Sequence, residues 1–88
     1  MVLDNYEPET TNLLKNLVKP GMVVIDVGAH VGYYTLLAAR QTGNLGKVYS
    51  FEPAPSNYAL LAKNIETTGY ENIEARQAAV SSSAGSLD

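Results

Sequence analysis

The sequence predicts an α/β fold, one half of a doubly wound sheet, with three parallel strands in the spatial order third, second, first and flanking helices. Segments of strand character alternate with segments of helical spacing along the 88 residues, and no linker or internal repeat divides them. Strands that alternate with helices in this way are joined by right-handed crossovers and lie parallel. The first strand segment is a continuous apolar run, which predicts a strand covered on both faces of the sheet.

The elements follow from local patterns along the chain. After a polar lead-in over residues 1–7, a helix is predicted from Pro8, where a missing N–H is harmless, to the breakers after Val18. The later elements are predicted in the order strand, tight loop, helix, strand, helix and strand, over residues 22–27, 28–32, 33–41, 47–52, 56–68 and 73–80. We therefore divide the chain into a leading helix within 1–21 and an α/β part over 22–88.

Apolar stripes on the helices are expected to form the core. On the leading helix the stripe consists of Leu13, Leu14, Leu17 and Val18, and on the helix after the first strand it includes Leu36 and Leu37. On the last helix it consists of Tyr58, Leu61, Ala62 and Ile65. Of the adjacent residues Tyr33 and Tyr34, one is expected to pack inward and the other to lie near a ligand.

Composition excludes several kinds of site and partner. Six basic residues against nine acidic ones give a net charge of -3, and the basic residues are scattered singly, which argues against nucleic acid. The absence of cysteine excludes disulfides, thiolate metal sites and a catalytic cysteine, and one histidine cannot form a histidine-rich metal site. No apolar run is long enough to span a bilayer, and the first residues do not resemble a secretory signal. We expect no membrane partner and a cytoplasmic location.

The loop after the first strand carries the strongest chemical signal, Asp26-Val27-Gly28-Ala29-His30-Val31-Gly32. In open α/β sheets, ligands bind beyond the carboxyl ends of the strands. Gly28 can adopt unusual backbone angles and lets a ligand approach the main chain, and Gly32 leaves the first amides of the next helix accessible. These glycines could also serve only to make a tight turn.

Glu52 is the second signal, because it ends the second predicted strand, twenty positions after Gly32. A carboxylate there can accept hydrogen bonds from both hydroxyls of a ribose. The alternative is a solvated acid ahead of a proline turn. The spacing favours a ribose-bearing ligand.

The charges around this loop indicate which ribose-bearing ligand fits. His30 occupies the second glycine position of the dinucleotide pattern G-x-G-x-x-G, and no Gly-Lys-Ser/Thr of a phosphate-binding loop follows. Asp26 and Glu52 flank the site, and the loop contains no Lys or Arg to neutralise a pyrophosphate. A ligand with an ammonium and a sulfonium suits two acids better, which points to S-adenosylmethionine.

The chain from Lys19 onward also resembles a known family. The segment Lys19–Leu36 is similar to the opening motif of class I S-adenosylmethionine-dependent methyltransferases, and more narrowly of the FkbM-type family, where an acid–apolar–Gly-Ala-Asn/His–apolar–Gly loop precedes Tyr-Thr-Leu. The segment Val48–Pro53 resembles the next motif of that family, and Asn64-Ile65 and residues 72–80 match more loosely. The resemblance implies a Rossmann-like fold of seven strands and methyl transfer mostly to hydroxyl oxygen, with acceptors such as sugars or other small molecules.

The resemblance assigns site residues position by position. It implies that Asp26, Gly28, His30 and Gly32 surround the methionyl part of the cofactor and that Glu52 holds the ribose. Near the adenine the chain offers Ala79 and Val80, with no acidic side chain for the amino group. The fourth-strand motif that usually carries acceptor and catalytic residues is absent, so no catalytic base can be named. The resemblance thus implies a truncated, cofactor-binding half, which we expect to be inactive alone.

Two other interpretations stay open at this point. An NAD-dependent oxidoreductase shares the strand, glycine loop and acid, although His30 and the resemblance count against it. A non-catalytic Rossmann-like binding module would retain the fold without chemistry. His30 as a catalytic base is a weaker alternative, because it occupies a cofactor-loop position. In the family's strand order the first strand would have a free apolar edge here, so we expect self-association through that edge.

Overall fold

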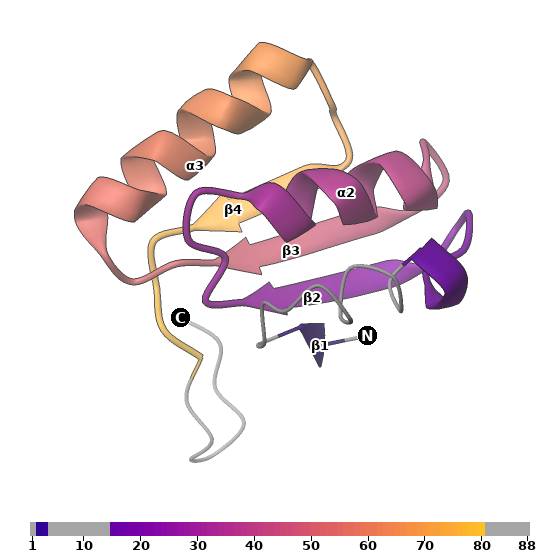
Figure 1. Ribbon diagram of the computed structural model, residues 1–88, viewed down its shortest axis with the longest axis horizontal. Helices are drawn as coiled ribbons and strands as arrows, with labels where there is room; N and C mark the ends of the chain where they lie inside the picture. The colour runs from indigo at the N-terminus through magenta and orange to yellow at the C-terminus, as the bar shows by residue number, and fades with distance from the viewer. Residues whose placement is uncertain (1, 4–14, 81–88) are drawn as a thin grey trace.

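The computed structural model describes residues 2–3 and 15–80, which form a parallel sheet with two helices over one face (Figure 1). The strands are β1 (Val2–Leu3), β2 (Val23–Val27), β3 (Lys47–Phe51) and β4 (Ile73–Arg76). The helices are α2 (Tyr33–Thr42) and α3 (Pro55–Thr68). Residues 15–17 are also helical, while most of the predicted leading helix, including Leu13 and Leu14, lies outside the described residues.

The strand order β1-β2-β3-β4, with every neighbouring pair parallel, confirms the predicted arrangement of the three main strands. In register, Val23 lies opposite Lys47 and Val27 opposite Phe51, so the carboxyl ends of β2 and β3 meet at one edge of the sheet. β4 ends at Arg76 and is shorter than the predicted strand over 73–80. The glycine loop follows β2 and Glu52 follows β3, so both lie at this edge of the sheet.

The outer side of β2 differs from the prediction. We expected a polar lead-in and a free backbone edge, but Val2 pairs with Ile25 and Leu3 with Asp26 in parallel. The prediction of a fully unpaired edge is therefore wrong over this stretch. A strand of two residues is too short to carry a detectable period, so no local pattern could announce it.

The described core lies on one face of the sheet. Val24 and Val48 are fully buried from β2 and β3, and Ala38 and Ala39 of α2 pack against them together with Val18. The small alanine side chains allow the helix to lie close to the strands. Figure 1 shows that α2 lies over the sheet and that α3 lies next to α2, on the side of β4.

The opposite face of the sheet is uncovered by the described residues, contrary to the expectation of cover on both faces. Val23 is 55% exposed, and it lines, with Ile25, Tyr49 and Phe51, a depression of about 350 Å³. Both crossovers run in the same direction across the sheet. Right-handed crossovers of that kind place both helices on one face, which explains the asymmetry.

On both helices fewer residues are buried than the apolar stripes predicted. On α2 the buried residues are Tyr34, Thr35, Ala38, Ala39 and Thr42, whereas Leu36 and Leu37 are half-buried. On α3 only Leu61 is buried among the described stripe, and Ala62 is exposed. The helix lies at the side of the sheet, so few of its residues reach the core. None of the helices in the described ranges is both long and apolar enough to cross a membrane.

Candidate functional site

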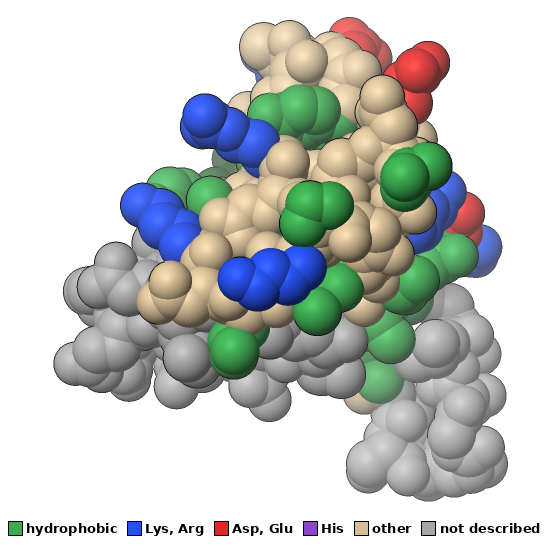
Figure 2. Space-filling view, turned by 90° about the vertical axis from the view of Figure 1, so that its right-hand side faces the viewer, with side chains coloured by type: hydrophobic (Ala, Val, Ile, Leu, Met, Phe, Trp, Pro, Cys, Tyr) green, Lys and Arg blue, Asp and Glu red, His purple; other side chains and the backbone are tan. Residues whose placement is uncertain are grey.

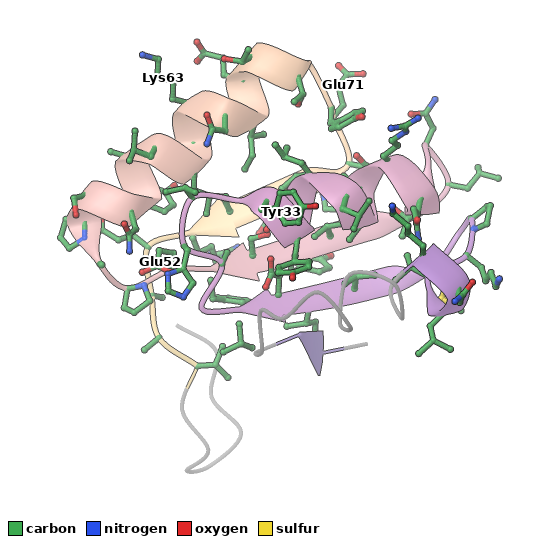
Figure 3. All side chains as sticks on the ribbon, viewed as in Figure 1. Tyr33, Glu52, Lys63 and Glu71 are labelled. Carbon is green, nitrogen blue, oxygen red and sulfur yellow. The ribbon has the colours of Figure 1, made fainter. Side chains whose placement is uncertain are left out.

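The loop over residues 28–32 and Glu52 are brought together at the carboxyl edge of β2 and β3. The backbone amides of Gly28 and Ala29 donate to the carbonyl of Phe51 at 2.8 and 3.0 Å, which ties the start of the loop to the end of β3. The amide of His30 donates to Glu52 Oε1 at 2.6 Å. The two motifs, separated in the sequence, thus form one site, and Figure 3 shows Glu52 at this end of the strands.

Glu52 is 4% exposed and uses both carboxylate oxygens to hold backbone groups. Oε1 accepts from the amide of His30, and Oε2 accepts from the amide of Ala54 at 3.0 Å. These bonds join the loop after β2 to the loop after β3, and His30 keeps a left-handed backbone with φ of 55°. A carboxylate has about four acceptor positions, so each oxygen can accept one further hydrogen bond from a ligand.

Gly28 leaves open space beside the loop. Its φ is +69°, and a Cβ placed on it would meet no heavy atom within 4 Å. A side chain there would be strained by the backbone and would fill that space. The open backbone next to Glu52 fits a ligand that approaches the main chain, which is what the predicted S-adenosylmethionine requires.

A close contact with α3, which the sequence did not reveal, leaves no room for a side chain at Gly32. Its φ is +102°, and a Cβ on it would lie 2.7 Å from Leu61 Cδ1. From the sequence this glycine was expected to leave the first amides of α2 accessible, and the structure adds a close approach to α3. Gly32 is also the N-cap residue of α2; it makes no side-chain cap hydrogen bond, and no acidic residue lies in the first turn. The first-turn amides of α2 have no intrahelical acceptors, and they give this end a partial positive charge.

Asp26 lies behind the loop and is fully buried. Thr35 Oγ1 donates to Asp26 Oδ2 at 2.6 Å and lies 2.7 Å from Ser50 Oγ. Because Thr35 has one hydroxyl proton and directs it at the carboxylate, Ser50 donates to Thr35. The three side chains link β2, α2 and β3 beneath the site. A direct contact of Asp26 with a ligand therefore stays a prediction, while its contact with Thr35 is a feature of the structure.

The sequence reasoning gave no role in the site to three polar residues that lie there, although two of them belong to the motifs of the resemblance. Thr35 and Ser50 are fully buried, and Asn64 of α3 donates through Nδ2 to the carbonyl of Val31 at 2.7 Å. Ser50 and Asp26 are cross-strand partners that interrupt two apolar runs at the same level. That coincidence is a signal that could have revealed the buried network. Asn64 offers only a weaker signal, because it follows Leu61 by one helical turn.

The remaining candidates occupy the surroundings of the site. Tyr34 is 6% exposed and packs inward, whereas Tyr33 is 64% exposed, so the expectation that one packs inward is confirmed. Ala79 is exposed and Val80 half-buried, just after β4. Across the described ranges, no three His, Asp or Glu residues gather as a metal site. Figure 2 shows basic side chains on one face separated by apolar and other side chains.

Comparison with known proteins identifies relatives among methyltransferases. The protein-L-isoaspartate O-methyltransferase of Methanococcoides burtonii is 32% identical over 68 residues, which cover 75% of this chain and 34% of the relative. Protein-L-isoaspartate O-methyltransferase 1 of Arabidopsis thaliana is 41% identical over 56 residues, which cover 64% of this chain and 24% of the relative. The chain thus spans about a third or less of the length of these curated relatives.

A solved structure and a family model point the same way. A SAM-dependent O-methyltransferase from Thermotoga maritima matches with a TM-score of 0.75 at 25% identity, over 88% of this chain and 30% of that one. The family model of the methyltransferase FkbM domain matches residues 26–86, which include the glycine loop and Glu52. The Thermotoga maritima enzyme is named as SAM-dependent, which agrees with S-adenosylmethionine as the cofactor predicted from the sequence. The chain belongs to the methyltransferase FkbM domain family.

Proposed function

We propose that this chain binds S-adenosylmethionine at the carboxyl edge of β2 and β3 and is the cofactor-binding part of a methyltransferase that acts on an oxygen atom. The main observation behind the proposal is the hydrogen bond from the amide of His30 to the carboxylate of Glu52. It joins the glycine loop to a carboxylate that retains acceptor positions, next to the open space at Gly28. A ligand with a ribose at one end fits that combination.

Each residue of the site has a distinct task in this proposal. Glu52 accepts hydrogen bonds from the ribose hydroxyls, and the loop residues Gly28, His30 and Gly32 border the methionyl part. The partial positive charge at the start of α2 suits its carboxylate. The nearby carboxylates of Asp26 and Glu52 favour a ligand with positive charge over a pyrophosphate.

When bound, S-adenosylmethionine supplies an activated methyl group. The residues of this chain then bind and orient the cofactor, so that the methyl points in one fixed direction. Rigid placement of this kind is what a network of backbone hydrogen bonds to Glu52 provides.

For the acceptor we propose a hydroxyl of a small molecule or sugar. The resemblance to FkbM-type enzymes supports it, and the curated relatives carry O-methyltransferase in their names, which supports oxygen as the acceptor atom. Methyl transfer by the full-length protein to a panel of sugars and small hydroxyl compounds, with an isoaspartyl peptide alongside, tests the class. Transfer to the peptide alone would replace the hydroxyl by a carboxyl acceptor. Inactivity of these 88 residues alone stays a prediction.

The cofactor proposal is tested by equilibrium binding. Titration calorimetry of the full-length protein with S-adenosylhomocysteine and with NAD should give binding of the first alone. Glu52→Gln should weaken that binding by roughly 1.5–3 kcal/mol, the scale of a hydrogen bond to a charged group. Glu71→Gln is the matched control, because Glu71 is exposed and points away from the site (Figure 3). Binding of NAD alone would establish the oxidoreductase alternative, and equal affinity in both variants would remove Glu52 from the site.

A further inference from the structure

Two neighbouring residues of helix α3 contact the glycine loop. Asn64 Nδ2 donates to the carbonyl of Val31 at 2.7 Å, across 33 positions of sequence. One helical turn earlier, Leu61 is fully buried against Gly32. The two side chains share one face of α3 because residues three apart are neighbours on a helix.

The contact of Asn64 acts on a single peptide unit of the loop. The carbonyl of Val31 and the amide of Gly32 belong to one planar group, so a bond at either end restrains the orientation of both. At one end Asn64 holds the carbonyl, and at the other the amide of Gly32 donates to the carbonyl of Ala29 at 3.0 Å. Two residues of this part of the loop have positive φ: His30, which precedes Val31, at 55°, and Gly32 at 102°. A segment in such rare backbone conformations keeps its shape only where the surroundings determine it.

We propose that Asn64 is a positioning residue for cofactor binding: it fixes the Val31–Gly32 peptide and so holds the loop in its binding shape before the ligand arrives. The side chain of Asn64 acts on the loop through the backbone carbonyl of Val31. The loop is held at its start by Phe51, at His30 by Glu52 and at Val31 by Asn64. The inference rests on the proposed function, since it assumes that this loop binds S-adenosylmethionine.

The test compares three variants of the full-length protein. Asn64→Asp keeps the size of the side chain but places a carboxylate, which has no donor, against the carbonyl of Val31. Asn64→Ala removes the donor in a residue that suits the helix well. Lys63→Ala is the control, because Lys63 is exposed and points away from the loop (Figure 3).

Three measurements separate positioning from simple stability. Amide hydrogen exchange without ligand should become about fivefold faster at His30 and Gly32 in both Asn64 variants, as expected for the loss of one hydrogen bond. Exchange at Val48 in β3 should accelerate no more than exchange at the loop, and the melting temperature should fall by no more than about 8 °C, the effect of one hydrogen bond of about 1 kcal/mol. Affinity for S-adenosylhomocysteine should fall by about fivefold or more. Lys63→Ala should alter none of these.

Each result decides between the inference and the proposed function. Faster loop exchange with weaker binding supports the inference. Faster loop exchange with unchanged affinity overturns the inference about Asn64. Unchanged exchange in both variants overturns it too. In both cases the proposed cofactor site stands. If binding weakens while the melting temperature falls by more than about 8 °C and exchange accelerates more in the sheet than at the loop, Asn64 has a purely structural role, and the inference is overturned. If the unchanged protein binds no S-adenosylhomocysteine, the proposed function falls, and the inference falls with it.

Discussion

Replacement of Glu52 by Gln should destabilise the fold at the edge where the loops meet. The carboxylate accepts from the amides of His30 and Ala54 at 2.6 and 3.0 Å and is almost fully buried, so water does not easily replace it. Glutamine has one side-chain oxygen and an amide group that cannot accept. It can therefore satisfy one backbone amide and must turn a donor toward the other.

The expected loss follows from one missing hydrogen bond to a charged acceptor. Such bonds contribute about 1.5–3 kcal/mol, and the free energy of unfolding should fall by about that amount. For a domain of this size each 1 kcal/mol lowers the melting temperature by about 4–8 °C. Urea denaturation followed by circular dichroism measures the free energy, and hydrogen exchange at His30 and Ala54 reports which amide loses its partner.

The same exchange of acid for amide at Glu71 provides the control. Glu71 is exposed, and surface substitutions of this kind change stability by about 0.5 kcal/mol or less. If Glu52→Gln unfolds at the same urea concentration as Glu71→Gln, the reasoning that the carboxylate joins the two loops is refuted. Faster exchange across the whole sheet, without a preference for His30 and Ala54, would refute the local part of it.

Three further changes test other contacts. Gly32→Ala should destabilise the fold by about 1–3 kcal/mol, since its Cβ would lie 2.7 Å from Leu61 Cδ1 on a backbone with φ of +102°, and thermal melting measures the loss. Thr35→Val should cost about 1–3 kcal/mol in urea denaturation, because Asp26 loses a buried donor while the side chain keeps its volume. Deletion of residues 1–3 should expose the backbone of β2 and increase self-association in sedimentation velocity, the behaviour that we propose for this edge.

Matched controls accompany the two substitutions, and the deletion is compared with the unchanged protein. Gly69→Ala has the same backbone problem, with φ of +75°, but no neighbour within 4 Å, so it should cost less than Gly32→Ala. Thr67→Val removes an exposed hydroxyl from α3 and should change stability by about 0.5 kcal/mol or less. Equal losses within either pair would contradict the contact in question. A deletion variant that sediments as the unchanged protein does would show that β1 does not protect the edge.

Several features could be predicted from the sequence because their causes are local. The apolar run of β2 was predicted over 22–27 and forms over Val23–Val27, and α2 was predicted over 33–41 and forms over Tyr33–Thr42. Breakers at the ends of these segments and the period of their apolar residues lie within a few positions. The parallel order follows from the alternation of elements, and it places the glycine loop and Glu52 at one edge.

Other features depend on contacts between residues that are far apart in the chain. Val2 lies beside Ile25, and Asn64 reaches Val31 across 33 positions. The burial of Asp26 behind the loop depends on Thr35, and whether Glu52 faces solvent or the amide of His30 depends on how the two loops fold together. Local patterns determine which segments become strands and helices, because backbone preference and periodicity act over a few residues. Long-range pairing, side-chain direction and burial are determined only when those segments pack, since each depends on atoms that the local sequence does not contain.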